Sequence, residues 1–417
     1  MARTAPAGVV LCGSVARRAA ANSVRRCWTL AALAWCLSLV WAGVGAAQEP
    51  VAPQQVDAVR LKAAIDTLGS LDYDTRTGAA RLIRRTPGAQ AVPALLATVS
   101  EHADGYVRFR ALVLLTGFGD ARTADAMRAS LGNPNDRIRA VAYSYFEHNP
   151  DASVLPSLLE GLEREQAEFV RPMLIRALAA HGADPRVQSS LIREVGRGED
   201  YFRSTVIEAL GDYHAGYAYD AVAAVATLDG PLLDDAALAL GKLGDPRALQ
   251  TLPLLQRSAP QEAQPFVAAA ICLLGTNCGS HETYLVQTLK FADNTVGFQE
   301  LLRGAASGLG ALGVSGRESA VQALFEAGIP SRDPARAPIA LALATVALRN
   351  TALMLTVLRG VDQRDAAIAL LAEGFDMLEE DLDKERFFAT VRHAYWSAPD
   401  GAADRALMQT LIGKLDF

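Results

Sequence analysis

Three glycines in this sequence have the spacing of a phosphate-binding loop. Gly308, Gly310 and Gly313 form a GxGxxG pattern, which in dinucleotide-binding folds follows a strand and holds a pyrophosphate at the start of a helix. Here the pattern ends an apolar helical stretch, where other parts of the chain also place glycine before a turn. We therefore predict a helix end at these glycines, no nucleotide site and no cofactor.

Histidines are the next candidates, because three of the six recur at a spacing of 33 residues. His148, His181 and His214 would lie one per structural unit, about 10 Å apart if the units stack as packed helices. That separation is too large for one metal ion, whose bonds to its ligands are about 2 Å long. The sequence also has no HExxH or GxSxG motif. We predict no metal site, no catalytic residues and no enzyme activity.

The cysteines allow two interpretations. Three of the five precede residue 48, and the other two, Cys272 and Cys278, lie six residues apart. In an oxidising compartment this pair would close a small loop, which contributes about 2 kcal/mol to stability. Alternatively, Cys272 is a small core residue and Cys278 a turn residue. Both interpretations remain open, and two cysteines without further ligands do not make a zinc site.

The N-terminal 47 residues have the pattern of an export signal. Arginines, including Arg25 and Arg26, precede an apolar run from Trp28 to Ala47, and the run ends in small residues that a signal peptidase accepts. We predict cleavage near Ala46 or Ala47 and a periplasmic or secreted protein. The alternative is an uncleaved anchor in the inner membrane, because a run of about 20 residues is long enough to span a bilayer.

Composition favours a large helical protein that does not bind nucleic acid. The chain has 417 residues, of which 51% are hydrophobic and only 6% aromatic, so small apolar side chains dominate. After residue 47, 35 Lys and Arg stand against 46 Asp and Glu. The net negative charge of the chain after residue 47 argues against binding to nucleic acid, which requires a basic face.

One pattern recurs about ten times at intervals of 29 to 35 residues. It consists of an apolar residue followed by Arg, then an apolar or Ala position three residues later, a Leu-rich stretch, and a turn of Gly, Asp and Pro. Gly244, Asp245 and Pro246 show the turn clearly, because Gly ends a helix, Asp caps the next and Pro suits its first position. The equivalent positions are 76, 108, 139, 171, 203, 234, 268, 303, 336 and 365. Each unit is therefore predicted to be two helices joined by a short turn.

The repeated pattern resembles HEAT repeats, and is most similar to the short bacterial kind first described in phycobilin lyases. The segment from Asp104 through Val107, Arg108 and Ala111 to Asp120 matches that family closely, whereas Asp234 and Ala268 stand where the family has Arg. The resemblance covers about residues 70–395. It implies that the helix bearing Val-Arg lines the concave side and that its arginines form a structural ladder between units: Arg76, Arg108, Arg139, Arg171, Arg203 and Arg303.

Such units cannot bury their apolar stripes alone, so they must stack into an all-α solenoid. We predict a superhelix of about ten two-helix repeats in the form of a curved rod, on the order of 100 Å long. Residues 48–69 form a linker and N-terminal capping helix, residues 70–395 the repeats, and residues 396–417 the C-terminal capping helix. The acidic run from Glu373 to Glu385 is expected to be a solvated helix face.

Two groups of residues are candidates for binding a partner. The first comprises exposed positions on the predicted concave helices, whose aromatic, Met and Arg content suits protein interfaces: Phe109, Arg110, Val113, Ser144, Met173, Arg176, Ser204 and Glu208. The second is an unusually aromatic turn containing Tyr213, His214, Tyr217 and Tyr219.

These observations predict an exported, non-catalytic scaffold that binds a protein or peptide through its concave surface. Contact with a membrane is expected only if the N-terminal segment stays uncleaved. The alternative, which the family resemblance implies, is a lyase or a protein that handles a chromophore or another ligand.

Overall fold

A computed structural model describes residues 49–228 and 230–415, and there the chain is entirely helical. The predicted export signal, residues 1–47, lies outside the described residues. Within the described ranges no helix has the length and apolar character needed to cross a membrane. The all-α solenoid predicted from the repeats is confirmed.

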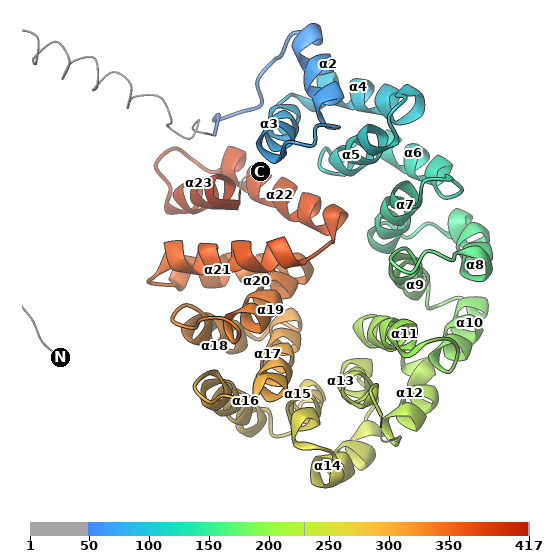
Figure 1. The fold of residues 1–417 in the computed structure, drawn as a ribbon, viewed down its shortest axis with the longest axis vertical. Coiled ribbons are helices and arrows are strands. Elements are labelled where there is room, and N and C mark those ends of the chain that lie inside the picture. The colour runs from blue at the N-terminus through green and yellow to red at the C-terminus, as the bar shows by residue number, and fades with distance from the viewer. Residues whose placement is uncertain (1–48, 229, 416–417) are drawn as a thin grey trace, which may run out of the picture. The chain divides into compact units, whose positions relative to one another are not determined.

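The helices form an inner and an outer row of a closed ring (Figure 1). The inner row comprises α3 (Tyr73–Arg84), α5 (Gly105–Thr116), α7 (Asp136–His148), α9 (Arg171–Ala179), α11 (Asp200–Asp212), α13 (Leu233–Leu243), α15 (Gln264–Leu273), α17 (Gln299–Val314) and α19 (Arg336–Arg349). The outer row comprises α4 (Gly88–Glu101), α6 (Arg122–Ser130), α8 (Leu155–Arg164), α10 (Pro185–Val195), α12 (Tyr219–Ala226), α14 (Ala248–Ser258), α16 (Cys278–Asp293) and α18 (Glu318–Gly328).

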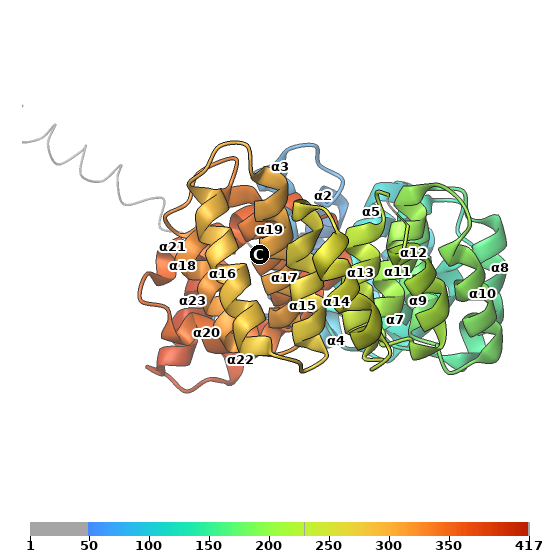
Figure 2. The same cartoon turned by 90° about the horizontal axis from the view of Figure 1, so that it is seen from below.

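The remaining helices occupy the two ends of the chain. The first end carries α2 (Ala58–Thr67), and the last carries α20 (Thr351–Gly360), α21 (Arg364–Met377), α22 (Asp381–Ser397) and α23 (Ala403–Leu415). Short 3₁₀ turns at Ala152–Val154, Gly216–Ala218 and Gln261–Ala263 lead into α8, α12 and α15. Seen from the side, the two rows make a flat band rather than a long rod (Figure 2).

Polar residues at the turns define where the helices begin. The side chains of Asp57, Asp72 and Asp104 accept hydrogen bonds from backbone N–H groups in the first turns of α2, α3 and α5. At the end of α13, Gly244 adopts a left-handed conformation with φ of 74°, which favours glycine. Gly and Asp thus act at these helix ends as predicted, but Asp245 and Pro246 lie in the turn before α14, which begins at Ala248 without a side-chain cap.

The solenoid curves more strongly than the predicted curved rod, so that its ends meet. Successive inner helices approach closely where glycine faces alanine: a methyl group on Gly211 would lie 3.1 Å from the Cα of Ala239, and one on Gly310 would lie 3.2 Å from the Cβ of Ala342. Small residues shorten the inner circumference while the outer helices remain apart. Helix α22 consequently packs against α5 and α7 from the other end of the chain (Figure 1).

Two hydrophobic cores run around the ring. The first extends from Leu61 to Ile271 and the second from Ala268 to Ile412, so they meet within α15. Leu382 of α22 belongs to the first core although its helix is otherwise part of the second. The apolar stripes of the repeats are therefore buried against neighbouring units, as a solenoid requires.

Candidate functional site

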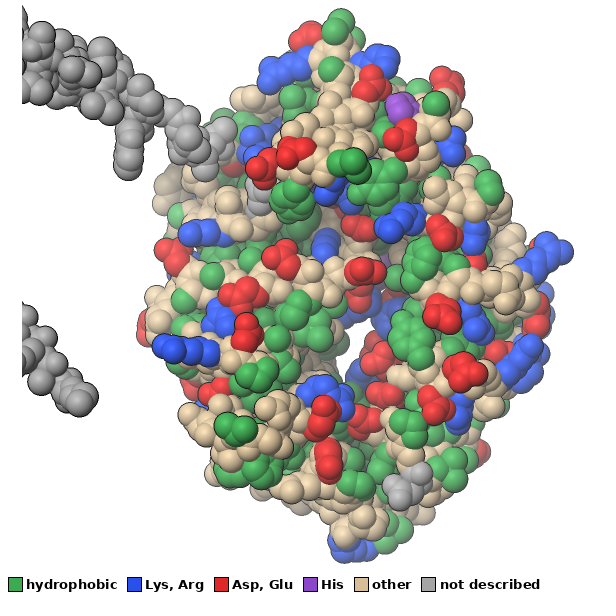
Figure 3. Space-filling view, viewed as in Figure 1, with side chains coloured by type: hydrophobic (Ala, Val, Ile, Leu, Met, Phe, Trp, Pro, Cys, Tyr) green, Lys and Arg blue, Asp and Glu red, His purple; other side chains and the backbone are tan. Residues whose placement is uncertain are grey.

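The inner helices surround an opening lined by acidic and basic side chains (Figure 3). We call this opening the lumen. Its wall carries a connected set of charged residues, which we call the lumen network: Glu147, His148, Arg176, Asp212, Lys242, Arg349, Glu380 and Asp383. Helices α7, α9, α11, α13, α19 and α22 contribute to it or adjoin it.

Arg176 on α9 links the helices on either side of it. Its Nε lies 2.8 Å from Oε1 of Glu147 and its Nη1 lies 2.8 Å from Oδ2 of Asp212. Lys242 then donates from Nζ to the other oxygen of Asp212 over 2.7 Å. Burial alone would lower the pKa of Arg176, but the two carboxylates outweigh it and raise that pKa well above its ordinary value.

Asp212 is held in its charged form by the same contacts. Burial acts to raise the pKa of this carboxyl, but the neighbouring charges and hydrogen bonds of Lys242 and Arg176 lower it well below the ordinary value. Tyr213, the next residue, donates from its hydroxyl to Oε1 of Glu147 over 3.0 Å. Burial and the charge of Glu147 raise the pKa of Tyr213. Asp212 and Tyr213 therefore make their polar contacts with other side chains of the protein.

Arg349 connects the network across the ring. Its guanidinium lies 3.4 Å from Glu147 on α7, 3.2 Å from Glu380 and 3.6 Å from Asp383. His148 Nε2 lies 2.7 Å from Oδ1 of Asp383. Burial acts to raise the pKa of Asp383, but the hydrogen bond from His148 and the charge of Arg349 lower it. Contacts between the first and last repeats thus form part of the lumen wall.

Two acidic residues in the lumen make fewer contacts with other side chains. Glu208 on α11 is exposed and, among the described residues, has no hydrogen-bond or ion-pair partner. Asp235 on α13 accepts a hydrogen bond of 2.6 Å from the hydroxyl of Ser204. Although the Glu208 side chain is exposed, the inner helices that surround the lumen reduce its hydration and raise its pKa despite the nearby Lys242, and desolvation also raises the pKa of Asp235. These carboxyls are available to a positively charged group.

The predicted concave residues divide between the lumen and the core. Arg176, Ser204 and Glu208 belong to the lumen, whereas Phe109 and Val113 are only 3% and 1% exposed. Ser144 is also buried, Met173 packs against the first core, and Arg110 pairs with Asp381. The expectation that Phe109, Val113 and Ser144 are exposed is wrong, because the tight curvature places them against neighbouring helices.

The aromatic turn mainly joins adjacent repeats. Tyr219 is buried and its ring lies 4.0 Å from the guanidinium carbon of Arg247. His214 Nδ1 lies 2.6 Å from the carbonyl oxygen of Lys242 in the next unit. Tyr217 is half-buried, and a methyl on Gly182 would lie 3.3 Å from its ring. Tyr213 contacts the lumen network through the carboxylate of Glu147, and His214 contacts it through the backbone carbonyl of Lys242.

The arginines of the predicted ladder make contacts of several kinds, most of them to the preceding turn or to another unit. Arg76, Arg108 and Arg139 each donate from Nη1 to the carbonyl oxygen six residues earlier, over 2.8, 3.1 and 2.8 Å. His102 is the C-cap of α4, whereas Ser70 and Asn133 lie in the turns that follow α2 and α6, so each arginine ties its helix to the preceding turn. Arg203 likewise donates to the carbonyl oxygen of Val195, whereas Arg171 stacks on the ring of Phe202 and Arg303 pairs with Asp234.

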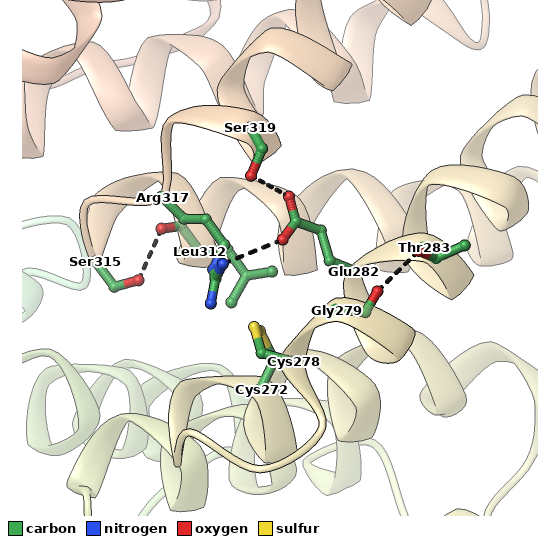
Figure 4. Close-up of a disulfide and its surroundings, with 9 residues drawn as sticks. All are labelled: Cys272, Cys278, Gly279, Glu282, Thr283, Leu312, Ser315, Arg317 and Ser319. Carbon is green, nitrogen blue, oxygen red and sulfur yellow. Dashed lines mark hydrogen bonds and ion pairs between the residues drawn. A yellow bond between two sulfur atoms is a disulfide. The ribbon is translucent and has the colours of Figure 1, made fainter.

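Cys272 and Cys278 form a disulfide, so the first of the two interpretations holds (Figure 4). The bridge spans the turn from α15 to α16. Beside it, Glu282 of α16 pairs with Arg317 at 3.5 Å and accepts a hydrogen bond from Ser319 in α18. The bridge therefore anchors a turn and lies outside the lumen network. In the described ranges, no three His, Cys, Asp or Glu side chains are placed to hold a metal ion.

The acidic run before and within α22 was the main feature that sequence reasoning missed. Glu373 is exposed, but Asp383 and Glu385 are only 5% and 1% exposed, so the run is not simply a solvated face. A signal was present, because Leu382 and Phe387 interleave with these acids at helical spacing. That pattern indicates acids on a packed face, although it does not reveal their partners.

One family model matches part of the chain. The model for HEAT repeats matches residues 61–147. No curated protein matches the chain. Similar solved structures include a Kap95p complex with RanGDP (12% identity, TM-score 0.37, 85% of this chain and 55% of that one) and importin beta (13%, 0.36, 85% and 55%).

The CpcE–CpcF phycocyanin lyase of Nostoc sp. PCC7120 is also similar (20% identity, TM-score 0.28, 81% of this chain and 100% of that one). The present chain spans about half the length of the Kap95p and importin beta chains that it matches. The HEAT-repeat model matches residues 61–147, and two-helix units of the same kind continue along the rest of the described chain.

Proposed function

We propose that this chain is an exported, non-catalytic scaffold that binds a protein or peptide partner on the lumen surface. The observation that carries the proposal is Glu208, an exposed carboxyl without a partner beside a network of paired charges. A lysine or arginine side chain of a partner would neutralise it and lower its raised pKa. The arginine-rich and apolar N-terminal segment supports the export part of the proposal.

Affinity purification with the full chain as bait tests the proposal. Glu208→Arg places a positive charge in the lumen and should reduce recovery of the partner at least tenfold. Glu326→Arg is the matched control, because Glu326 is an exposed glutamate of the outer helix α18 that has no hydrogen-bond or ion-pair partner among the described residues. Equal recovery with both variants would show that the lumen does not bind the partner.

The alternative function, handling of a chromophore, makes a different prediction. After incubation with a bilin and removal of the free pigment, such a protein would retain visible absorbance. A scaffold of the kind proposed would retain none. N-terminal sequencing of the protein isolated from its host tests export separately, since cleavage near Ala46 or Ala47 would leave a new terminus just before Glu49.

A further inference from the structure

The place where the ring closes differs from every other junction between its repeats. We call this junction the seam; there α22 meets α3, α5 and α7. Elsewhere, successive inner helices share continuous apolar cores. At the seam, Leu382 is the single described residue of α22 that joins the core of the first repeats. The other contacts at the seam include ion pairs and the aromatic side chains of Phe388, Tyr395 and Trp396.

One buried ion pair lies at the centre of the seam. Arg84 on α3 donates from Nε to both carboxylate oxygens of Glu385 over 3.0 Å and from Nη2 to Oε2 over 2.6 Å. The two side chains are only 7% and 2% exposed. Glu385 also packs against the end of α5, because a methyl on Gly117 would lie 2.7 Å from its Oε1. This bidentate pair joins residues 301 positions apart in sequence.

Further ion pairs lie on either side of it. Arg110 on α5 contacts Asp381 at 3.0 Å, with side chains 18% and 40% exposed. His148 at the end of α7 contacts Asp383 at 2.7 Å. All of the acids in these pairs come from α22, and all of their cationic or imidazole partners come from the first repeats. In these three pairs α22 supplies the acid and the first repeats supply its partner, whereas Arg392 of α22 pairs with Glu49 in the opposite sense.

The chain segment before α2 closes the same seam from outside the helices. Trp396 of α22 donates from Nε1 to the carbonyl oxygen of Pro50, and Tyr395 donates from its hydroxyl to the carbonyl oxygen of Glu49, each over 3.0 Å. Arg85 at the end of α3 donates from Nε to the Glu49 carboxylate over 2.7 Å. The segment therefore bridges the first and last repeats.

We infer that the ring opens and closes at the seam, and that its ion pairs act as a latch. Separating an apolar interface exposes hydrocarbon to water, which is unfavourable. Separating buried ions restores their hydration, and this offsets much of the attraction that is lost. The seam is therefore the junction at which the ring separates most easily. Opening exposes the lumen to a partner too large to enter the closed ring; this access step rests on the proposed function, whereas the opening itself does not.

Hydrogen exchange of the full chain, followed by mass spectrometry of its peptides, tests the latch. In Arg84→Glu, peptides from α22, α5 and residues 49–56 should exchange at least tenfold faster, while those from α13 and α17 keep the wild-type rate. The exchanged pair Arg84→Glu with Glu385→Arg should restore slow exchange at the seam. Asp381→Lys disrupts a partly exposed pair and should give a smaller, several-fold acceleration if the buried variant does not fold.

Arg359→Glu is the control, because it breaks an exposed pair with Asp404 between α20 and α23, away from the seam. It should leave exchange at the seam unchanged. Unchanged exchange at the seam in both Arg84→Glu and Asp381→Lys would overturn the latch. Uniform acceleration of all peptides would overturn it as well, because the ring would then unfold as a whole. Neither result depends on a partner, so the exchange experiment tests the latch independently of the proposed function.

Discussion

At the residue scale, Glu208 makes the lumen sensitive to pH. Burial and the nearby acids Asp235 and Asp212 raise its pKa, although Lys242 acts to lower it. A raised pKa in the folded state means that Glu208 contributes stability below its unfolded pKa, and that this contribution is lost as pH rises through the folded value. Asp212 has the opposite sign, because its lowered pKa stabilises the fold above the ordinary value and the gain is lost in acid.

Glu208→Gln should therefore stabilise the protein at neutral pH but not in acid. Because the side chain is exposed, the expected gain is small, about 1–2 °C in melting temperature at pH 7 and none at about pH 4. Thermal melts at the two pH values measure it. Glu326→Gln on the outer helix α18 should change neither value, and an equal gain at both pH values for Glu208→Gln would contradict the assignment.

The disulfide is a second residue-scale feature with a measurable effect. Cys272 and Cys278 close a short loop at the turn before α16, and the double replacement by serine should cost about 2 kcal/mol of unfolding free energy. Urea denaturation of the wild type with and without reductant should show the same loss. A loss that reductant does not reproduce would point to packing of the buried Cys272 instead of the bridge.

Some lumen residues were predictable and others were not. Arg176 and Glu208 follow from their register on a helix that bears the repeat pattern. Val113 occupies the equivalent helix position yet is buried, because register alone does not say how strongly the stack curves. The partners of Asp383 and Glu385 come from α3 and α7, more than 200 residues earlier, and no local pattern identifies them.

At the element scale, close contacts between inner helices determine the curvature. A methyl on Gly374 of α21 would overlap the backbone carbonyl of Ala340 on α19, and one on Gly241 would lie 2.7 Å from the carbonyl oxygen of Ala270. The backbone cannot yield as a side chain does. Gly374→Ala should therefore destabilise the protein by about 1–3 kcal/mol.

Gly78→Ala provides the matched control. Gly78 is an exposed position inside α3, and a methyl there would meet nothing within 4 Å. The same replacement should stabilise this helix by about 0.5–1 kcal/mol, because alanine has the higher helix propensity. Chemical denaturation of both variants gives the comparison. If Gly374→Ala were also stabilising, the close approach of α19 and α21 would be wrong.

The helices themselves were well predicted from sequence. The spacing of the Val-Arg pattern, the Asp caps and the left-handed Gly244 specify local structure, and each acts within a few residues. Among the arginines of the pattern, Arg108 donates to the carbonyl oxygen of His102 at the end of the preceding helix, a contact that depends only on the local turn. Local capping needs no knowledge of how the units stack.

At the scale of the whole molecule, closure of the ring could not be predicted. A repeat pattern establishes that neighbouring units stack, but the angle between them accumulates over the whole chain. Small differences at each junction, such as glycine opposite alanine, determine whether the stack forms an open superhelix or a ring. The Arg84–Glu385 pair forms only after that angle is established.

The two hydrophobic cores predict how the molecule unfolds. They meet within α15 and are joined at the seam mainly by ion pairs, so each half should unfold as a cooperative unit. Ile175→Ala lies in the first core and Leu309→Ala in the second, and both side chains are fully buried. Each replacement should cost about 2–5 kcal/mol, but only in the half that contains it.

Hydrogen exchange at increasing urea concentration distinguishes the two halves. In Ile175→Ala, peptides from α7 to α13 should open at lower urea while those from α17 to α21 keep the wild-type profile, and Leu309→Ala should do the reverse. Breaking the latch with Arg84→Glu should separate the two transitions further, because the seam is the second of the two places where the halves meet. A single transition that every variant shifts for all peptides would mean that closure makes the ring one cooperative unit.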